Sequence, residues 1–588
     1  MGMREYNPYG TESVEVKFIC NNCGHEVVSD NIIVPIPDFS AENHSDSIQD
    51  NYGNAVCSNC GKEYEVFVYA GMSGGDVEVD DVEDEKIIDV IEYYEEEHKS
   101  IDKNIQDKKY TNIYTGFKIN SFKVADWYIL KDFEINFQHN INVIIGENGS
   151  GKSTVIECIT LIFRHLYKYF IENDTTASFI EGYTICFESQ DIETGEWYNI
   201  SIKSNYITER ERSFNPILII NQVESSIKDN KELIKKILPT KIGIYYAGIT
   251  DRLEKLSLYF EEKYRRQVTQ AKKPATLYPL NLPSPRPILY TKKEHIGIMF
   301  LCLLISDNLE IKRCIEEELN INIATTEIEF NFQKPSWAKS SVDDFWGASD
   351  LARQFIMLLT EYSDKQTISE DRIKISHNCL YIKDELKRIF ADSVELHIFD
   401  ILDFLLFNDL LESIDIKWES QTKENIELDH LSEGEKQLIT AIAFRLLWEK
   451  QKGFLLFDEP DTFLHPKWQR EYIQMIEHQE NIFSIITTHS PTLVGTIEKE
   501  QVNIMDKGKI VQHDSHTFGR DINSILLDLF KVKERSDEGE KLLNSFYEAM
   551  DKKDYKMAKE YLNNIQTKFG KNDNTTIKTN FLFDDFAE

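Results

Sequence analysis

A glycine-rich segment at residues 146–154 constrains the fold of this chain more than any other feature. An apolar run, Ile141 to Ile145, precedes it, and an amphipathic stretch, Val155 to Phe163, follows it. A strand, a glycine-rich turn and a helix N-terminus in this order predict a P-loop. The backbone N–H groups of such a loop surround phosphate oxygens. The alternative is an ordinary Gly/Ser loop. The predicted phosphate-binding residues are Gly146, Glu147, Asn148, Gly149, Ser150, Gly151, Lys152, Ser153 and Thr154.

Two of these side chains have a specific expected role. Lys152 should reach the β- and γ-phosphates of a nucleotide, and the Ser153 hydroxyl should bind Mg²⁺. A second apolar run, Phe454 to Phe457, ends in two acids, Asp458 and Glu459, followed by proline. The first acid can hold the same Mg²⁺ and the second can polarise an attacking water. The alternative is that both carboxylates are merely solvated at the end of a strand.

Two further motifs follow in the C-terminal half. Leu431-Ser432-Glu433-Gly434-Glu435-Lys436-Gln437 precedes an apolar helix, Leu438 to Trp448, and a short polar loop at a helix N-terminus is an anion site. Thr487-Thr488-His489-Ser490-Pro491 follows a strand-like run, Phe483 to Ile486. A lone histidine in that position is usually structural, so His489 is a candidate only because the other three motifs are present.

In this order the four motifs resemble the ABC-type ATPase head of SMC-like, RecF-like and related AAA-family proteins. The resemblance implies that Ser432, Gly434 and Glu435 bind the γ-phosphate of ATP held by a second protomer. It also implies that Glu459 is the catalytic base, that His489 contacts the γ-phosphate, and that Asp461 lies at the dimer seam. In such heads a glutamine links the site to the helical lobe; Gln222 is the candidate, and a structural role for it is equally open.

Three more segments resemble bacterial AAA-family ATPases of antiphage defence, such as the Septu ATPase. They are Tyr245-Tyr246-Ala247 with Arg252, Phe463 to Pro466, and Phe518 to Leu526. The likeness covers about residues 113 to 570. It implies a component that binds and hydrolyses ATP, dimerises head to head, senses invasion and controls an effector such as a nuclease, which this chain itself does not contain. The alternatives are a RecF/SMC-like ATPase of DNA repair or chromosome maintenance, and a nucleotide-gated scaffold with little turnover.

Four of the nine cysteines form two Cys-x-x-Cys-Gly pairs near the N-terminus. The spacing of Cys20 and Cys23, and of Cys57 and Cys60, predicts a Cys₄ zinc site, and strand-like runs beside them favour a zinc ribbon. Disulfides are disfavoured in a reducing cytosol. The remaining cysteines are expected to be small core residues; they are Cys158, Cys186, Cys302, Cys314 and Cys379.

The formal net charge of −35 argues against a protein that coats nucleic acid. Any DNA contact must be local, and the candidate is the basic cluster formed by Lys263, Arg265, Arg266, Lys272, Lys273, Lys292 and Lys293, for which a solvated helix face is the simpler interpretation. The longest uncharged apolar run, Ile296 to Ser306, is too short to cross a bilayer. We therefore expect a cytoplasmic protein without membrane contact.

The expected fold class is α/β, with an ABC-type P-loop head as its centre. A zinc ribbon (1–75) and an acidic linker (76–112) precede the N-terminal ATPase lobe (113–250). A compact, mostly helical insertion (251–425) follows, because prolines and the lack of heptads exclude a long coiled coil. The C-terminal ATPase lobe (426–530) carries the signature segment (Leu431 to Gln437), the acidic pair Asp458 and Glu459, and His489. A helical hairpin with a flexible tail (531–588) ends the chain.

Overall fold

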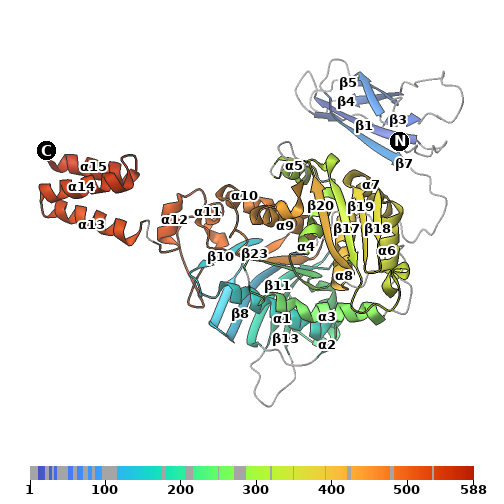
Figure 1. Ribbon diagram of the computed structural model, residues 1–588, viewed down its shortest axis with the longest axis horizontal. Helices are drawn as coiled ribbons and strands as arrows, with labels where there is room; N and C mark the ends of the chain where they lie inside the picture. Colours follow the sequence, from blue (N-terminus) through green and yellow to red (C-terminus); the bar gives the residue numbers. More distant parts are fainter. Residues whose placement is uncertain are drawn as a thin grey trace, which may run out of the picture. The chain divides into compact units, whose positions relative to one another are not determined.

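The chain divides into two compact units, Met1–Thr111 and Asn112–Glu588 (Figure 1). The computed structural model describes residues 116–587, apart from 175–179, 192, 205–215, 249, 271–285, 318, 320, 349, 391–392, 420–425, 450, 477–481 and 533–534; before residue 116 it describes only the backbone of seven strands. All structural statements below concern these residues.

The first unit contains two small sheets. One has the order β2-β1-β3, with β7 also paired to β1, and the other has the order β4-β5-β6. The seven strands are β1 (Thr11–Ile19), β2 (Glu26–Val28), β3 (Ile32–Pro35), β4 (Asn51–Val56), β5 (Glu63–Ala70), β6 (Val77–Asp81) and β7 (Ile87–Glu95).

Strands β6 and β7 lie in the acidic stretch that we expected to be a linker. β7 pairs antiparallel with β1 from Thr11↔Glu95 to Phe18↔Ile87. Isoleucine, valine and tyrosine recur between the acids of this segment, and such residues favour strands. The predicted zinc ligands lie outside the described residues: one Cys-x-x-Cys pair falls between β1 and β2, and the other between β4 and β5.

A seven-stranded sheet forms the centre of the second unit, in the order β16-β15-β22-β23-β10-β24-β25. Its strands are parallel except β25. They are β10 (Ile141–Gly146), β15 (Lys241–Tyr246), β16 (Ile288–Tyr290), β22 (Gly453–Asp458), β23 (Phe483–Thr487), β24 (Val502–Asp506) and β25 (Lys509–Val511). Every residue of the middle strands β22 and β23 is buried, because helices cover both faces of a parallel sheet.

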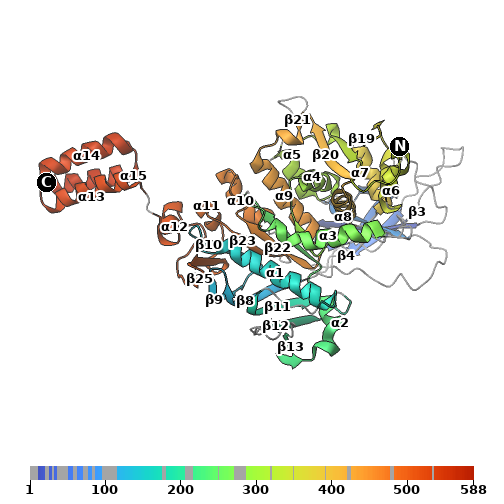
Figure 2. The same ribbon diagram turned by 60° about the horizontal axis from the view of Figure 1, so that its bottom comes forward.

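Helices α1 (Lys152–Phe170) and α9 (Glu433–Trp448) cover opposite faces of this sheet (Figure 2). Along β22, Phe454 and Leu456 belong to the apolar cluster that contains α1, whereas Leu455 and Phe457 belong to the cluster that contains α9. The period of two residues therefore directs successive side chains of this strand to the α1 side and the α9 side of the sheet. The expected P-loop strand and helix are confirmed, and α1 is longer than expected.

A six-stranded antiparallel sheet also packs against α1. Its order is β14-β13-β12-β11-β8-β9, and its apolar residues share one cluster with the buried face of α1. The strands are β8 (Phe117–Trp127), β9 (Leu130–Asn136), β11 (Glu181–Gln190), β12 (Trp197–Lys203), β13 (Ile217–Ile220) and β14 (Val223–Ser225), and α2 (Ile227–Ile237) follows them.

Residues 251–425, which we expected to be mostly helical, contribute four strands to a second antiparallel sheet with the order β18-β19-β17-β20-β21, of which β21 follows this region. Its strands are β17 (Glu327–Gln333), β18 (Lys365–Ile368), β19 (Arg372–Asn378), β20 (Leu411–Trp418) and β21 (Ile426–Glu427). The helices of this region are α3 (Glu254–Gln270), α4 (His295–Ile305), α5 (Leu309–Glu317), α6 (Asp350–Glu361), α7 (Cys379–Phe390) and α8 (Val394–Phe407). No helix in the described part of the chain is long and apolar enough to span a bilayer.

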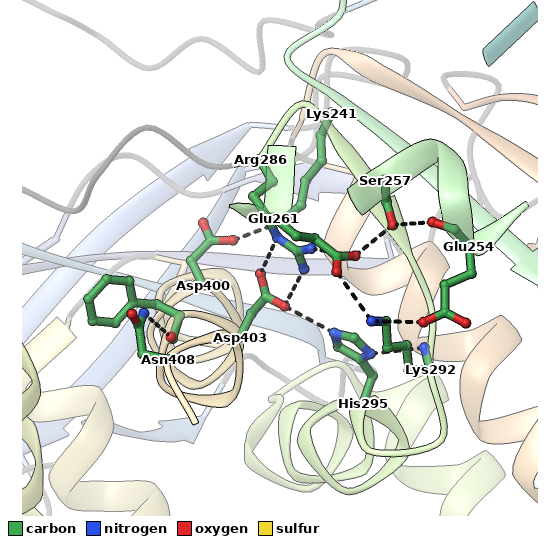
Figure 3. A network of polar contacts seen from close by, with 11 residues as sticks. Lys241, Glu254, Ser257, Glu261, Arg286, Lys292, His295, Asp400, Asp403 and Asn408 are labelled. Carbon is green, nitrogen blue, oxygen red and sulfur yellow. Dashed lines mark hydrogen bonds and ion pairs between the residues drawn. The ribbon is translucent and has the colours of Figure 1, made fainter. Parts of the chain in front are cut away.

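A buried ionic network ties α3, α4 and α8 together (Figure 3). The Arg286 guanidinium lies 2.6 Å from the Asp403 carboxylate and 3.2 Å from Glu261, and His295 Nε2 lies 3.0 Å from Asp403. Burial acts to raise the pKa of Asp403, but Arg286 and His295 outweigh it and hold the pKa at about 2. The carboxylate therefore stays charged and fixes these three helices around one guanidinium.

After α10 (Pro466–Ile476), α11 (Pro491–Val494) and α12 (Ile522–Asp528), the chain ends in three helices. They are α13 (Asp537–Asp551), α14 (Tyr555–Phe569) and α15 (Asn574–Ala587), around a small core of their own. We expected a two-helix hairpin and an unstructured tail. The tail is helical instead: Phe583 packs on the core of α13 and α14, and Gln566 of α14 donates to Asn580 of α15 at 2.7 Å.

Candidate nucleotide-binding site

The phosphate-binding loop connects the end of β10 directly to the start of α1. Gly151 caps this helix with a left-handed φ of 110°, and a Cβ there would lie 2.8 Å from Met505 Cε and 2.9 Å from Ile129 Cγ2. Only glycine fits both the angle and the space. The tightly packed turn leaves the N-terminus of α1 directed at the site, where its amides and dipole favour an anion.

Lys152, the first residue of α1, folds back over the loop. Its Nζ donates to Gly146 O at 3.0 Å and to Glu147 O at 3.3 Å, and lies 2.6 Å from His489 Nε2. Burial lowers the pKa of Lys152, while nearby Glu459 and Asp458 act in the opposite direction. The ammonium group therefore stands among groups that a phosphate oxygen could replace.

Asp458, at the end of β22, faces the start of α1. Its Oδ1 accepts a hydrogen bond from Ser153 Oγ at 3.0 Å and a second one from the Thr487 hydroxyl. The side chain is buried, and burial raises the pKa of Asp458 against these two hydrogen bonds. A buried carboxylate beside a hydroxyl fits Mg²⁺, which binds to few protein oxygens and keeps several waters.

Glu459 and His489 follow the ends of neighbouring strands. Glu459 has a left-handed φ of 52°, which is unusual for a residue with a side chain, and its amide donates to Thr487 O at 3.0 Å. His489 Nε2 lies 3.6 Å from the Glu459 carboxylate, and both side chains remain 35% exposed. Burial, and then Lys152, lower the pKa of His489, so its neutral Nε2 can accept from the lysine.

The signature segment forms the N-terminus of α9. Ser432 Oγ accepts from the Glu435 amide at 3.3 Å, and the Ser432 amide and hydroxyl each donate to the Glu435 carboxylate at 2.7 Å. Gly434 is buried against the backbone of Phe463, whose carbonyl oxygen would lie 2.8 Å from an added Cβ. Within the described residues, no hydrogen bond or ion pair joins this segment to the phosphate-binding loop of its own chain.

Residues 117–494 match the family model of the AAA ATPase domain. The chain belongs to this family. The match begins at the first strand of the second unit and ends in α11, just after His489. It thus spans all four motifs.

Three curated relatives show how far the similarity of this AAA ATPase reaches. The retron Vc95 probable ATPase of Vibrio cholerae serotype O1 biovar El Tor is 24% identical over 422 residues, which are 66% of this chain and 74% of that protein. The retron Ec83 probable ATPase of Escherichia coli is 30% identical over 26% of this chain and 32% of its own length. The Septu protein PtuA of Bacillus thuringiensis is 30% identical over 22% of this chain and 31% of its own length.

Solved heads of two protein classes align with part of this chain at low TM-scores. An SMC head domain from Thermotoga maritima aligns with 68% of this chain and all of its own length, at 11% identity and a TM-score of 0.28. The recombination mediator RecF, in a structure titled RecF-ATPrS, aligns with 68% of this chain and 98% of its own, at 13% identity and a TM-score of 0.28.

Two further residues that the sequence analysis named are Gln222, expected to link the site to the helical lobe, and Asp461. Gln222 lies in the exposed turn between β13 and β14, with a φ of 68°, and makes no described contact with the site. Asp461, expected at a dimer seam, is only 5% exposed within one chain, and its carboxylate interacts with the Thr488 side chain.

The sequence did not identify two side chains beside the phosphate-binding loop. Arg252 Nη2 lies 3.3 Å from Thr154 Oγ1 and also contacts Glu157, and its guanidinium lies 5.6 Å from the ring centre of Tyr128. Tyr128 is 68% exposed, at the turn between β8 and β9. Arg252 was noted only through its neighbours Tyr245 and Tyr246, and nothing in the sequence distinguishes Tyr128 from other surface tyrosines.

Three residues of the basic cluster considered for DNA are paired with acids. Lys263 lies 2.7 Å from Glu172, and Arg265 lies 3.6 Å from Asp409. Lys292 lies 3.0 Å from Glu254 and 3.2 Å from Glu261 (Figure 3). Lys272 and Lys273 fall outside the described residues. The pairing reduces the local positive charge, and a DNA contact here remains a prediction.

Proposed function

We propose that this AAA ATPase binds and hydrolyses Mg²⁺-ATP between two copies of the chain, as the switching component of an antiphage defence system. One observation carries the proposal: Lys152, Asp458, Glu459 and His489 meet at the ends of adjacent parallel strands. Ligands bind at this end of open α/β sheets. The signature segment, which would complete a γ-phosphate site, makes no hydrogen bond or ion pair with that point among the described residues of its own chain.

Each residue has a chemical task in this proposal. Lys152 and the amides at the start of α1 bind the β- and γ-phosphates. Ser153 and Asp458 would hold Mg²⁺, which neutralises charge between the phosphates when bound. Glu459 orients and polarises the attacking water, and His489 donates a hydrogen bond to the γ-phosphate once Lys152 has turned from it to the phosphates.

The second copy would supply Ser432, Gly434 and Glu435. The capping box fixes this segment at the start of α9, where the first amides of the helix, and the Ser432 hydroxyl once it has turned from Glu435, would form one anion site at the surface. A phosphate bound there and to Lys152 of the partner would exist only when two heads have met. ATP would therefore favour the closed dimer, and hydrolysis would release it.

The defence role rests on resemblance, supported by the similarity to the two retron probable ATPases and to the Septu protein PtuA. In this proposal, opening and closing of the heads controls an associated effector such as a nuclease. Purification of the chain with the products of its neighbouring genes should recover that effector. A genomic neighbourhood without any nuclease or toxin gene would contradict the defence role.

Turnover measurements separate this proposal from its alternatives. Glu459→Gln should lower kcat by roughly 10²–10⁴-fold, because it removes the base and keeps the volume. The same variant should remain dimeric in Mg²⁺-ATP on a sizing column. Equal rates for wild type and variant would favour a scaffold with little turnover. Strong stimulation of the wild type by DNA would favour a repair ATPase.

For the first unit we propose a structural zinc ion. β1 pairs with β2 from Lys17↔Val28 to Ile19↔Glu26, and β4 pairs with β5 from Asn51↔Val68 to Val56↔Glu63. Each Cys-x-x-Cys pair thus lies in the segment that connects two paired strands. A domain of this size has little apolar core, and bound metal would contribute most of its folding free energy.

A further inference from the structure

The edge of the site beyond Asp458 is formed by two consecutive tyrosines. β15 lies beside β22 in parallel, and Tyr246, its last residue, pairs with Asp458. The next amide, Ala247 N, donates to Asp458 O at 3.3 Å. The two strands therefore end together, and Tyr246 is the neighbour of the proposed Mg²⁺ ligand on the side away from Glu459 and His489.

Tyr246 lies on the face of the sheet that carries Asp458 and α1. Paired residues of parallel strands project to the same side, and Tyr246 packs against the apolar cluster that contains α1. A Cβ added to Gly248 would lie 2.0 Å from the Tyr246 hydroxyl, so the phenol extends past the end of its strand. Within the described residues this half-buried hydroxyl has no hydrogen-bond partner, and it can donate to or accept from a ligand.

Tyr245 projects to the opposite face, toward the signature helix. It packs against the apolar cluster that contains α9, and its hydroxyl faces the side chain of Gln437. Gln437 is 4% exposed, and neither the nitrogen nor the oxygen of its side-chain amide makes a hydrogen bond within the described residues. It lies in the second turn of α9, whose first turn carries Ser432 and Gly434. Burial raises the pKa of Tyr245, so the phenol stays protonated.

We propose that Tyr246 and Tyr245 together couple the binding of Mg²⁺-ATP at Asp458 to the position of the signature helix, α9. Tyr246 binds the water shell of the metal and γ-phosphate beside Asp458, and Tyr245 transmits a shift of the β15 end to α9 through Gln437. The tyrosine pair takes the linking role that the sequence led us to seek at Gln222. This inference rests on the proposed function, because it assumes that Mg²⁺-ATP occupies the site.

The test uses full-length protein with the Glu459→Gln substitution, so that ATP is not consumed. Tyr246→Phe should weaken binding of a fluorescent ATP by about tenfold in Mg²⁺ and by less than about twofold in EDTA, because it removes one hydrogen bond to a charged group. Tyr245→Phe should leave both affinities within about twofold. It should instead remove most of the slowing of amide hydrogen exchange that Mg²⁺-ATP causes in residues 432–440.

Tyr547→Phe is the control, since it removes a partly exposed phenol from α13, outside the ATPase domain, and should change neither readout. Wild-type Mg²⁺-ATP affinity in Tyr246→Phe, or an equal loss with and without Mg²⁺, would overturn the role of Tyr246. Normal slowing of exchange in Tyr245→Phe would overturn the link. If the parent protein stays monomeric in ATP, the proposed function fails, whereas both readouts still decide the tyrosine link within one protomer.

Discussion

Lys152 Nζ and His489 Nε2 lie 2.6 Å apart, although the two residues come from α1 and from the segment after β23. The lysine that should bind phosphate is thus held by two backbone carbonyls and by the histidine that should sense the γ-phosphate. Nucleotide binding must exchange these contacts for phosphate oxygens. Binding of ATP should therefore separate His489 from Lys152 in the same step.

Replacement of His489 tests this relationship. His489→Ala should lower kcat by roughly 10²-fold, because it removes a donor to the transferring phosphoryl group. ATP affinity should change little, since the variant loses a contact with the γ-phosphate but also loses the Lys152–His489 contact that ATP must break. Single-turnover rates and fluorescent-ATP titrations measure the two effects, with His489→Gln as the control that keeps a donor and part of the rate. An alanine variant with wild-type turnover would remove His489 from the mechanism.

Asp461 should make stability depend on pH. Burial raises its pKa to about 6, against a hydrogen bond with Thr488. Between roughly pH 4 and 6 the folded carboxyl keeps a proton that the unfolded one has lost, so stability falls as pH rises through this window. Asp461→Asn should be more stable than wild type by about 1–3 kcal/mol at pH 8 and equally stable near pH 4.

Thermal unfolding of both proteins across this pH range measures the difference. Asp528→Asn, at an exposed position, is the control and should show no such gain. A gain for Asp461→Asn that does not depend on pH would mean that the carboxyl is not held protonated by burial.

The convergence of Lys152, Asp458, Glu459 and His489 could be predicted from the sequence because each motif follows a short apolar strand. Ile141 to Ile145, Phe454 to Phe457 and Phe483 to Ile486 are buried runs, and parallel strands bring their ends to one edge whatever lies between them. The order of the strands could not be derived in this way. Tyr246 was therefore not recognised as the neighbour of Asp458, and Gln222 was chosen from its position in the chain alone.

The insertion was predicted to be mostly helical because its longest apolar segments are helices. The alternation of apolar and polar residues in 327–333, 372–378 and 411–418 is a strand signal that could have corrected this. β7 was missed for a different reason: acids dominate the stretch 76–97 around it, whereas β7 itself is mostly isoleucine, valine and tyrosine. The last helix, α15, is stabilised by packing on α13 and α14, which local composition does not show.

Gly297 tests the packing of α4 on β20 in the insertion. An added Cβ would lie 2.6 Å from the Ile414 carbonyl oxygen, which belongs to the backbone of the strand and cannot move aside. Gly297→Ala should destabilise the protein by about 1–3 kcal/mol. Gly495→Ala is the matched control, because its nearest neighbour is the flexible end of Ile525 at 3.2 Å. Denaturant midpoints measure both, and equal effects would contradict this packing.

The proposed zinc ion has a direct chemical test. Metal analysis should find one zinc per chain in wild type and about none when Cys20 and Cys23 are both replaced by serine, because a Cys₄ site needs all its thiolates. Cys186→Ser, in the ATPase unit, is the control and should keep its zinc. Full zinc content in the double variant would place the metal elsewhere or make it adventitious.

Shared ATP sites are tested most directly by mixing two inactive variants. Lys152→Ala disables the phosphate-binding loop, and Ser432→Arg disables the exposed signature segment, so neither protein alone should hydrolyse ATP. In a mixed dimer one of the two sites combines an intact loop with an intact signature. We expect the equimolar mixture to regain up to about a quarter of wild-type turnover, since half of the dimers are mixed and half of their sites are intact. A mixture that stays as inactive as its parts, or a Ser432→Arg protein that is fully active alone, would contradict ATP sites built from two chains.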